Sequence, residues 1–200
     1  MIASVCLEPC LSVCDMARYC KPLTMLPEPP SSSMHTWVPD GSETVFLVKS
    51  RSSTLLYLPR TDMMYYAHPL YALGPTCADN TIFISQFVVD HGCTPRLLVF
   101  DMVSDGGESL QGVAAPDRYR RLQARVECLQ QPHCVLQWVG EQSAMDGNFF
   151  AGLPHKVRTH LTLTEDPLSL YIPDVAPRTP CASRDSDLGD AAARMTLRRG

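Results

Sequence analysis

The sequence predicts an α+β domain built mainly from antiparallel sheet, and three observations carry this prediction. Apolar, β-branched runs bounded by Gly, Pro and Asp recur through residues 34–173. Short turn sequences separate neighbouring runs, which is typical of hairpins. Only one segment, 116–128, has a strong helical pattern.

Residues 81–122 are the most informative stretch. Two largely apolar strands are expected at 81–90 and 95–104, joined by a His-Gly-Cys-Thr turn. An Asp-Gly-Gly turn then leads into a third, shorter strand at 108–113. Sheet strands with at least one buried face give continuous apolar runs of this kind.

The helix expected at 116–128 begins where Pro116 and Asp117 suit the first turn. Tyr119, Leu122 and Val126 form an apolar stripe with helical spacing. We interpret the arginines of this segment as a solvated face in preference to a nucleic-acid patch.

Other segments complete the predicted sheet. For residues 63–73 the sequence allows either a helix or irregular structure, and Pro69 argues against a long helix. The remaining expected elements are a short strand near Trp37, a hairpin of 44–50 and 53–58 that turns through Arg51 and Ser52, and strands within 135–139 and 161–172.

The composition divides the chain into three parts. Residues 1–33 are a Cys- and Pro-rich arm that ends in a Pro- and Ser-rich linker, which predicts a flexible segment. Residues 34–173 hold nearly all the apolar periodicity and are expected to form the folded domain. Residues 174–200 shift to Pro, Arg, Ser, Asp and Ala, the profile of a disordered tail. Both tails are candidate segments for binding protein partners.

Charge and cysteine usage narrow the class of protein. The net charge of −4 gives no overall cationic field for duplex nucleic acid. No apolar run approaches the roughly 18 residues of a membrane span, and the N-terminus makes a poor secretory signal. The nine cysteines are therefore expected to be reduced thiols in the cytoplasm or nucleus. Pro9 interrupts the Cys6, Cys10, Cys14 spacing, so we expect no metal site there.

The common catalytic motifs of hydrolases, nucleoside triphosphatases, dinucleotide-binding enzymes and zinc proteases are absent. Asp101 ends an apolar run and Asp146 precedes a glycine. For both residues we expect a capping or terminating role, which is common for Asp at the ends of elements.

Three segments carry a resemblance. The runs T-I-F-I-S-Q-F-V-V-D (81–90), R-L-L-V-F-D-M-V (96–103) and D-R-Y-R-R-L (117–122) resemble, in order and spacing, the middle of the covalent nucleotidyltransferase superfamily. That group contains mRNA capping guanylyltransferases and nucleic-acid ligases. Lys49 falls where the superfamily has the lysine nucleophile of its K-x-D-G-x-R motif. The resemblance implies a nucleotidyltransferase-like fold of the guanylyltransferase and ligase kind.

Departures from the superfamily pattern predict a chain that does not catalyse nucleotidyl transfer. The resemblance places Gln86 where the superfamily has a metal-binding glutamate, and Ile84 where it has an aspartate. A neutral amide cannot supply the charge that a carboxylate gives to a hard cation. Thr54 occupies the position of the arginine in the K-x-D-G-x-R motif. We therefore expect neither a metal nor a cofactor, and Lys49 is the nucleophile only under the alternative of an active enzyme.

A second resemblance is more specific. V-K-S-R-S-S-T (48–54) is similar to the V-A-S-R-G-S-T segment of the snurportin-like cap-binding domains, and His155, Lys156 and His160 resemble their H-K-x-T-H run. It implies a non-catalytic module that binds a methylguanosine RNA cap or a guanine nucleotide.

The ligand-binding residues follow from that resemblance. An aromatic face attracts a methylated, cationic guanine by stacking and by cation–π interaction. Tyr171 corresponds to the family's stacking tryptophan, and Trp37 is the other aromatic candidate; the alternative is that both are half-buried core residues. Lys49, Ser50, Arg51 and Gln86 complete the predicted site, with the cations facing phosphates. A third alternative is an interaction scaffold that has lost ligand binding.

Overall fold

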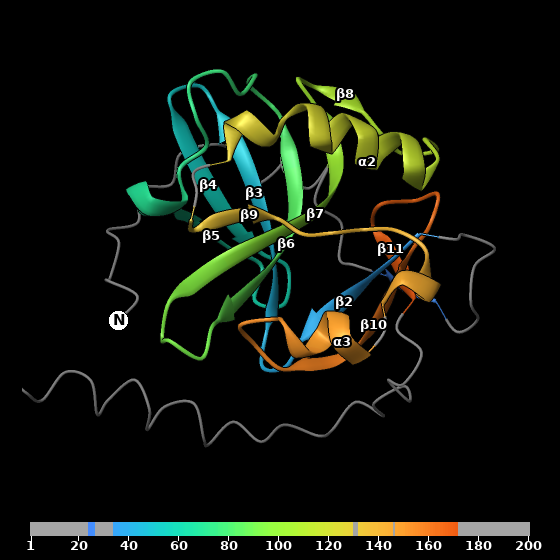
Figure 1. Cartoon of the computed structure of the whole chain (residues 1–200). Helices are drawn as coiled ribbons and strands as arrows, with labels where there is room; N and C mark the ends of the chain where they lie inside the picture. The colour runs from blue at the N-terminus through green and yellow to red at the C-terminus, as the bar shows by residue number, and fades with distance from the viewer. Residues whose placement is uncertain (1–23, 27–33, 130–131, 146, 172–200) are drawn as a thin grey trace, which may run out of the picture.

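The computed structural model describes residues 24–26, 34–129, 132–145 and 147–171, and two sheets form most of this part of the chain (Figure 1). The larger sheet has the order β5-β4-β3-β6-β7-β8, with β9 paired to β7. Its strands are β3 (Glu43–Ser50), β4 (Ser53–Leu58), β5 (Met63–Tyr66), β6 (Ile82–Val89), β7 (Pro95–Asp105), β8 (Glu108–Ser109) and β9 (Cys134–Leu136).

The smaller sheet has the order β1-β11-β10-β2. Its strands are β1 (Thr24–Met25), β2 (His35–Pro39), β10 (Val157–Leu163) and β11 (Ser169–Tyr171). The helical elements are α2 (Ala115–Ala124), α3 (Gly147–Ala151) and the 3-10 turns η1 (Pro69–Tyr71), η2 (Val126–Cys128) and η3 (Gln142–Ala144). No helix in the described ranges is long and apolar enough to cross a bilayer.

The two predicted hairpins are confirmed. β3 and β4 pair antiparallel from Phe46–Tyr57 to Ser50–Ser53, which leaves Arg51 and Ser52 as a two-residue loop. Arg51 has φ 51°, the left-handed conformation that such tight hairpin loops require. β6 and β7 also pair antiparallel along their whole length, with two register shifts that bend the pair.

Several predicted boundaries are wrong. Strand β8 stops at Ser109, because Gly112 adopts φ 80° and turns the chain before residue 113. The helix ends at Ala124, and a tighter 3-10 turn follows it and leaves Val126 44% exposed, off the predicted stripe. Residues 63–73 form an edge strand and a 3-10 turn that begins at Pro69.

The small sheet also differs from the prediction. The segment 161–172, where strands were expected, holds the end of β10 and the whole of β11, with Pro167 between them, and β10 begins earlier, at Val157. Thr24–Met25, within the arm predicted to be flexible, pairs parallel with β11. The small sheet is therefore assembled from both ends of the described chain.

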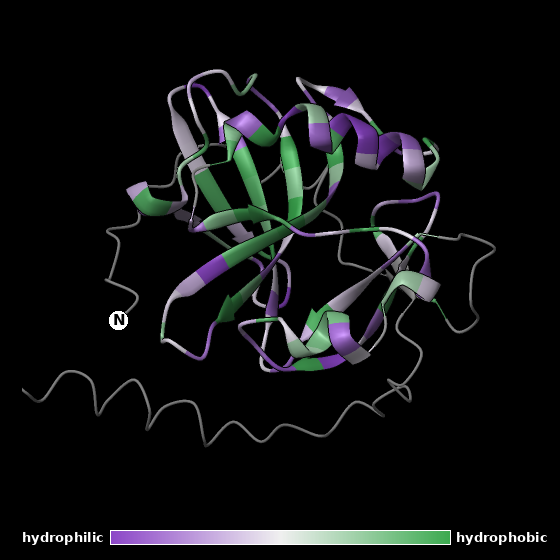
Figure 2. Ribbon diagram, in the orientation of Figure 1, coloured by the Kyte–Doolittle hydropathy of each residue, from purple (hydrophilic) through white to green (hydrophobic). Residues whose placement is uncertain are grey.

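The core lies between the large sheet and the elements packed on it. Figure 2 shows apolar residues concentrated on the central strands β3, β6 and β7, and polar residues along the outer side of α2. Phe46, Phe83 and Phe100, one from each central strand, are fully buried. These strands read as continuous apolar runs because both of their faces are covered.

A buried ion pair joins the large sheet, α2 and the small sheet. Arg118 and Asp101 are 0% and 1% exposed. Arg118 Nε donates to Asp101 Oδ1 at 2.9 Å, and Arg118 Nη2 donates to Oδ2 at 2.7 Å. The same guanidinium donates to the carbonyl oxygens of Val113, Thr164 and Glu165. One side chain thus ties β7 and the start of α2 to the segment that follows β10.

The energetics of the pair depend on its complete hydrogen bonding. Burial raises the pKa of Asp101, and Arg118 and the Met102 N–H, which both donate to the carboxylate, act in the opposite direction. A buried pair of this kind stabilises little against an apolar replacement of both partners, but losing one partner leaves a buried charge without compensation.

Two sequence interpretations are corrected here. Asp101 does not terminate a strand, because β7 continues to Asp105 and the carboxylate is the partner of Arg118. The helix arginines are not one solvated face, since Arg118 is buried while Arg120 is exposed. Helical periodicity places Arg118 on the inward side, next to Tyr119 and Leu122.

We predict that Arg118→Met lowers the free energy of unfolding by about 3–5 kcal/mol, because Asp101 then remains buried and unpaired. Urea titration followed by circular dichroism measures this. Arg120→Met, which removes only the exposed pair with Asp117, is the control and leaves the midpoint unchanged. Equal midpoints for the two variants would contradict the role assigned to the buried pair.

Candidate functional site

Lys49 does not lie in an open groove. It occupies the C-terminal half of β3, is 6% exposed and pairs with Thr54 of β4. Its ammonium lies near the buried thiol of Cys77; burial, followed by Cys128, raises the pKa of Cys77 to about 12, and Lys49 acts in the opposite direction. Lys49 therefore belongs to the covered side of the large sheet.

Gln86 is separated from Lys49 by the register of the sheet. Gln86 of β6 lies opposite Thr44 of β3, five positions before Lys49, which corresponds to roughly 16 Å along the strand. Side chains alternate between the two faces of a strand, so Thr44 and Lys49 point to opposite faces. Gln86 accepts a hydrogen bond from Ser42 and donates one to Thr44. Lys49 and Gln86 therefore do not face a common site.

The other predicted ligand residues are dispersed too. Ser50 pairs with Ser53 at the end of the β3–β4 hairpin, and Arg51 is exposed at its tip. Tyr171 lies opposite Thr162 in the small sheet, and its side chain is outside the described part of the structure. Trp37 lies on β2 in that same sheet and is buried. Of the predicted residues, Trp37 alone has described side-chain contacts that lead to a pocket.

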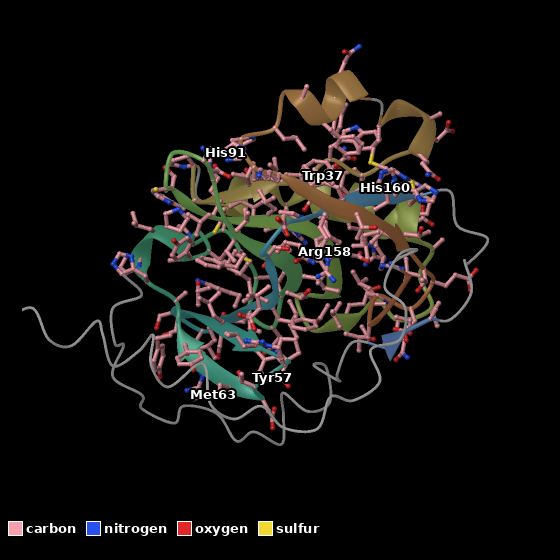
Figure 3. The ribbon with its side chains drawn as sticks, turned by 90° about the horizontal axis from the view of Figure 1, so that it is seen from below. Trp37, Tyr57, Met63, His91, Arg158 and His160 are labelled. Atoms are coloured by element: carbon pink, nitrogen blue, oxygen red, sulfur yellow. The ribbon has the colours of Figure 1, made fainter. Side chains whose placement is uncertain are left out.

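That pocket is an open trough of about 840 Å³ between β10 and the segment that contains α3. We call it the β10–α3 trough. Its lining comes from His91, Gln142, Phe150, Ala151, Leu153 and the continuous run 155–160. Figure 3 shows His91, Trp37 and His160 along the side of β10 that faces α3.

The small sheet explains why Trp37 and His160 belong to this side. Trp37 lies directly opposite His160, so both side chains share the outer face. The next pair, Thr36 and Leu161, is fully buried on the inner face, toward the core. The alternation of β2 and β10 thus assigns one face to the core and the other to the trough.

A hydrogen-bonded chain holds the wall of the trough. Trp37 Nε1 donates to His155 Nε2 at 3.0 Å, so the proton of this imidazole resides on Nδ1, which lies 3.1 Å from Asp90 Oδ1 and donates to it. Arg96 Nε lies 2.5 Å from the other oxygen of Asp90, as an ion pair without hydrogen-bond alignment. Both nitrogens of His155 are therefore occupied, and this residue offers a ligand its ring face only.

Aromatic rings connect Trp37, which is buried, and Trp138, which is half-buried, to the trough. The Phe149 ring lies 5.2 Å from the Trp37 ring and 5.5 Å from the Trp138 ring, centroid to centroid. Phe150 lies 5.4 Å from Phe149 and 5.4 Å from His160. Edge-on and tilted contacts of this kind are favourable and orient each ring. Phe150 and His160 present the outermost rings of this cluster to the trough.

The charge of the trough differs from that of the surrounding surface. Arg120, Arg121 and Arg125, on or next to α2, face the carboxylates of Asp117, Glu108 and Asp105. Lys156 and Arg158 line the trough, are exposed, and have no carboxylate partner among the described residues.

Lys156 and Arg158 are the permanently charged residues in the lining of the trough. Burial, and to a lesser extent His160, lower the pKa of His35, which lies beside His160 on the outer face. No residue that lines the trough is acidic. Within the described ranges, no three His, Cys, Asp or Glu side chains are grouped to hold a metal ion.

Sequence reasoning missed the trough as a site, although one signal pointed to it. The resemblance of His155, Lys156 and His160 to the H-K-x-T-H run marked part of its lining. His91 lies in the turn after β6, and Phe150 lies in α3. Tertiary packing brings both residues beside that run.

The fold is shared with known structures. No protein-family model matches the sequence, and no curated protein matches it. The chain is similar to the ligase domain of LigD from M. tuberculosis, with 13% identity, a TM-score of 0.52 and 76% of this chain covered. It is also similar to mycobacterial DNA ligase D complexed with ATP and MES, with 14% identity, a TM-score of 0.48 and 74% of this chain covered.

The similarity defines the class of fold. The chain spans 58% of the length of each of these ligase structures. The predicted α+β, antiparallel-sheet fold of the nucleotidyltransferase kind is confirmed. A likeness at this level of identity establishes the fold alone, so the function has to be argued from the site.

We predict that Gly140→Ala disturbs the aromatic cluster. A Cβ at this position would lie 2.4 Å from the Trp138 ring, and two backbone hydrogen bonds with His35 hold Gly140 in place. The indole must therefore move away from Phe149, at a cost of about 1–3 kcal/mol in unfolding free energy. Urea titration and tryptophan fluorescence measure the two effects. Gly147→Ala in α3, where nothing lies within 4 Å, is the control and leaves both unchanged or slightly raises stability.

Proposed function

We propose that this chain is a non-catalytic nucleotide-binding module, and that its ligand is a guanine nucleotide or the capped 5′ end of an RNA, held in the β10–α3 trough. The observation that carries the proposal is the pairing of two cations without carboxylate partners, Lys156 and Arg158, with the exposed edge of an aromatic cluster. The volume of about 840 Å³ is within the range of small-molecule sites.

Each part of a nucleotide has a matching group in the trough. Phosphate oxygens are recognised by guanidinium and ammonium groups, and Arg158 offers bidentate geometry. A base gains stacking energy on an aromatic face, which Phe150 and His160 supply. A methylated guanine is cationic and gains cation–π attraction on the same face. The lining has no carboxylate to balance the positive charge of a methylated guanine. The phosphates of the cap itself supply that negative charge.

The positions of Lys49 and Gln86 argue against nucleotidyl transfer. A lysine nucleophile must reach the α-phosphate, and the metal that assists it needs carboxylate ligands nearby. Lys49 is buried beside Cys77, and the residue at the superfamily's glutamate position is a neutral amide on the opposite face. Binding without transfer fits these positions.

Binding tests the proposal directly. We expect saturable binding of GTP and of a methylated cap analogue by isothermal titration, and about tenfold weaker binding for Arg158→Ala, since a hydrogen bond to a charged group contributes about 1.5 kcal/mol or more. Arg51→Ala, which removes an exposed arginine outside the trough, is the control and leaves the affinity unchanged. If no saturable binding is measured, or if the two variants lose the same affinity, the proposal is wrong. The chain is then an interaction scaffold that has lost ligand binding.

Labelling separates binding from catalysis. Incubation with radiolabelled GTP or ATP and Mg²⁺ is expected to give no covalent protein–nucleotide adduct, because Lys49 has no access to a bound phosphate. Denaturing electrophoresis followed by autoradiography detects such an adduct. An adduct that disappears in Lys49→Ala would establish the enzyme instead.

A further inference from the structure

We infer that the β10–α3 trough binds an internal segment of single-stranded nucleic acid, with successive phosphates lying along the open edge of β10, and that it does not require a strand end. This inference rests on the nucleotide-binding function proposed above. Three features carry it: the lining of the trough, the incomplete pairing of β10, and the position of its two cations.

The lining shows that the trough follows the edge of a strand. Successive side chains of a strand point to opposite faces, so a pocket over one face contacts every second residue. The trough instead contacts four consecutive residues of β10, Val157 to His160, together with His155 and Lys156, which precede the strand. It therefore extends from the outer face of β10 to the edge of this strand.

That edge is open where the trough runs. On one side, β10 pairs with β2 from Val157 to Thr162. On the other side, β11 pairs only with Thr162 and Leu163, so residues 157–161 have no neighbouring strand in the described part of the chain. An open edge presents backbone N–H and C=O groups to a ligand.

Two cations lie at the start of the open edge. Lys156 directly precedes β10, and Arg158 is the second residue of this strand. A register shift between Val157 and Thr159 inserts Arg158 as an exposed extra residue, and such bulges redirect side chains.

The form of the trough favours a polymer over a free nucleotide. It is open to solvent and does not form an enclosed cavity, so a bound chain can extend beyond it. Phe150 and His160 form a stacking platform beside the phosphate track. A charged track with a stacking surface is the usual design for binding single strands without sequence preference.

Fluorescence anisotropy with labelled oligoribonucleotides tests this inference. A mononucleotide, a dinucleotide, a tetranucleotide and an octanucleotide are compared with a circular octanucleotide at several salt concentrations. We expect affinity to rise about tenfold from the mononucleotide to the tetranucleotide, and the circle to bind like the linear octanucleotide. Two phosphate contacts give a slope of log K against log salt of about −1.4, and Lys156→Ala or Arg158→Ala each reduces its steepness by about 0.7. Arg51→Ala, the control, leaves the slope unchanged.

The outcomes separate this inference from the proposed function. If the mononucleotide binds as tightly as the octanucleotide, or the circle does not bind, the internal-strand inference is wrong and the nucleotide-binding function stands. If no nucleotide or oligonucleotide binds, both are wrong. If polyglutamate of equal charge competes equally well, with the same dependence on Arg158, the trough is a general polyanion site and the inference is overturned.

Discussion

The buried contact of Arg118 with Asp101 is the constraint on which the rest of the structure depends. The guanidinium satisfies both carboxylate oxygens and three carbonyl oxygens, from the chain before α2 and the chain after β10. Two of those carbonyl oxygens belong to the segment between β10 and β11, so a contact with strict geometry connects the small sheet to the large sheet. The trough lies at β10, and its place in the molecule follows from the same contact.

The two faces of the small sheet have different roles. Its inner face, with Thr36 and Leu161, closes the core, and its outer face, with Trp37 and His160, forms the side of the trough. Trp37 lies behind the lining, where its indole N–H is held by His155, which Asp90 orients in turn. The aromatic residue expected to stack on a ligand thus supports the residues that do line the trough. The trough is separate from the covered side of the large sheet that holds Lys49.

Charge is distributed differently on α2 and in the trough. The arginines on and beside α2 are each matched by a carboxylate, as expected for a chain whose net charge is negative. Lys156 and Arg158 keep their charge available because no described carboxylate lies within ion-pair distance. Local attraction for an anionic ligand therefore coexists with an overall acidic protein.

The sequence alone determined the strands and hairpins, since apolar runs and turn residues act over a few neighbouring positions, as in β3, β4, β6 and β7. It also indicated the nucleotidyltransferase-like fold, from the order of those segments. Only the tertiary structure decided the site. Which face Lys49 and Gln86 occupy depends on strand register, the burial of Arg118 depends on which side of α2 meets β7, and the trough forms where α3 packs against β10. Register and packing bring together residues that are far apart in the chain, so a pattern over neighbouring residues does not predict these contacts.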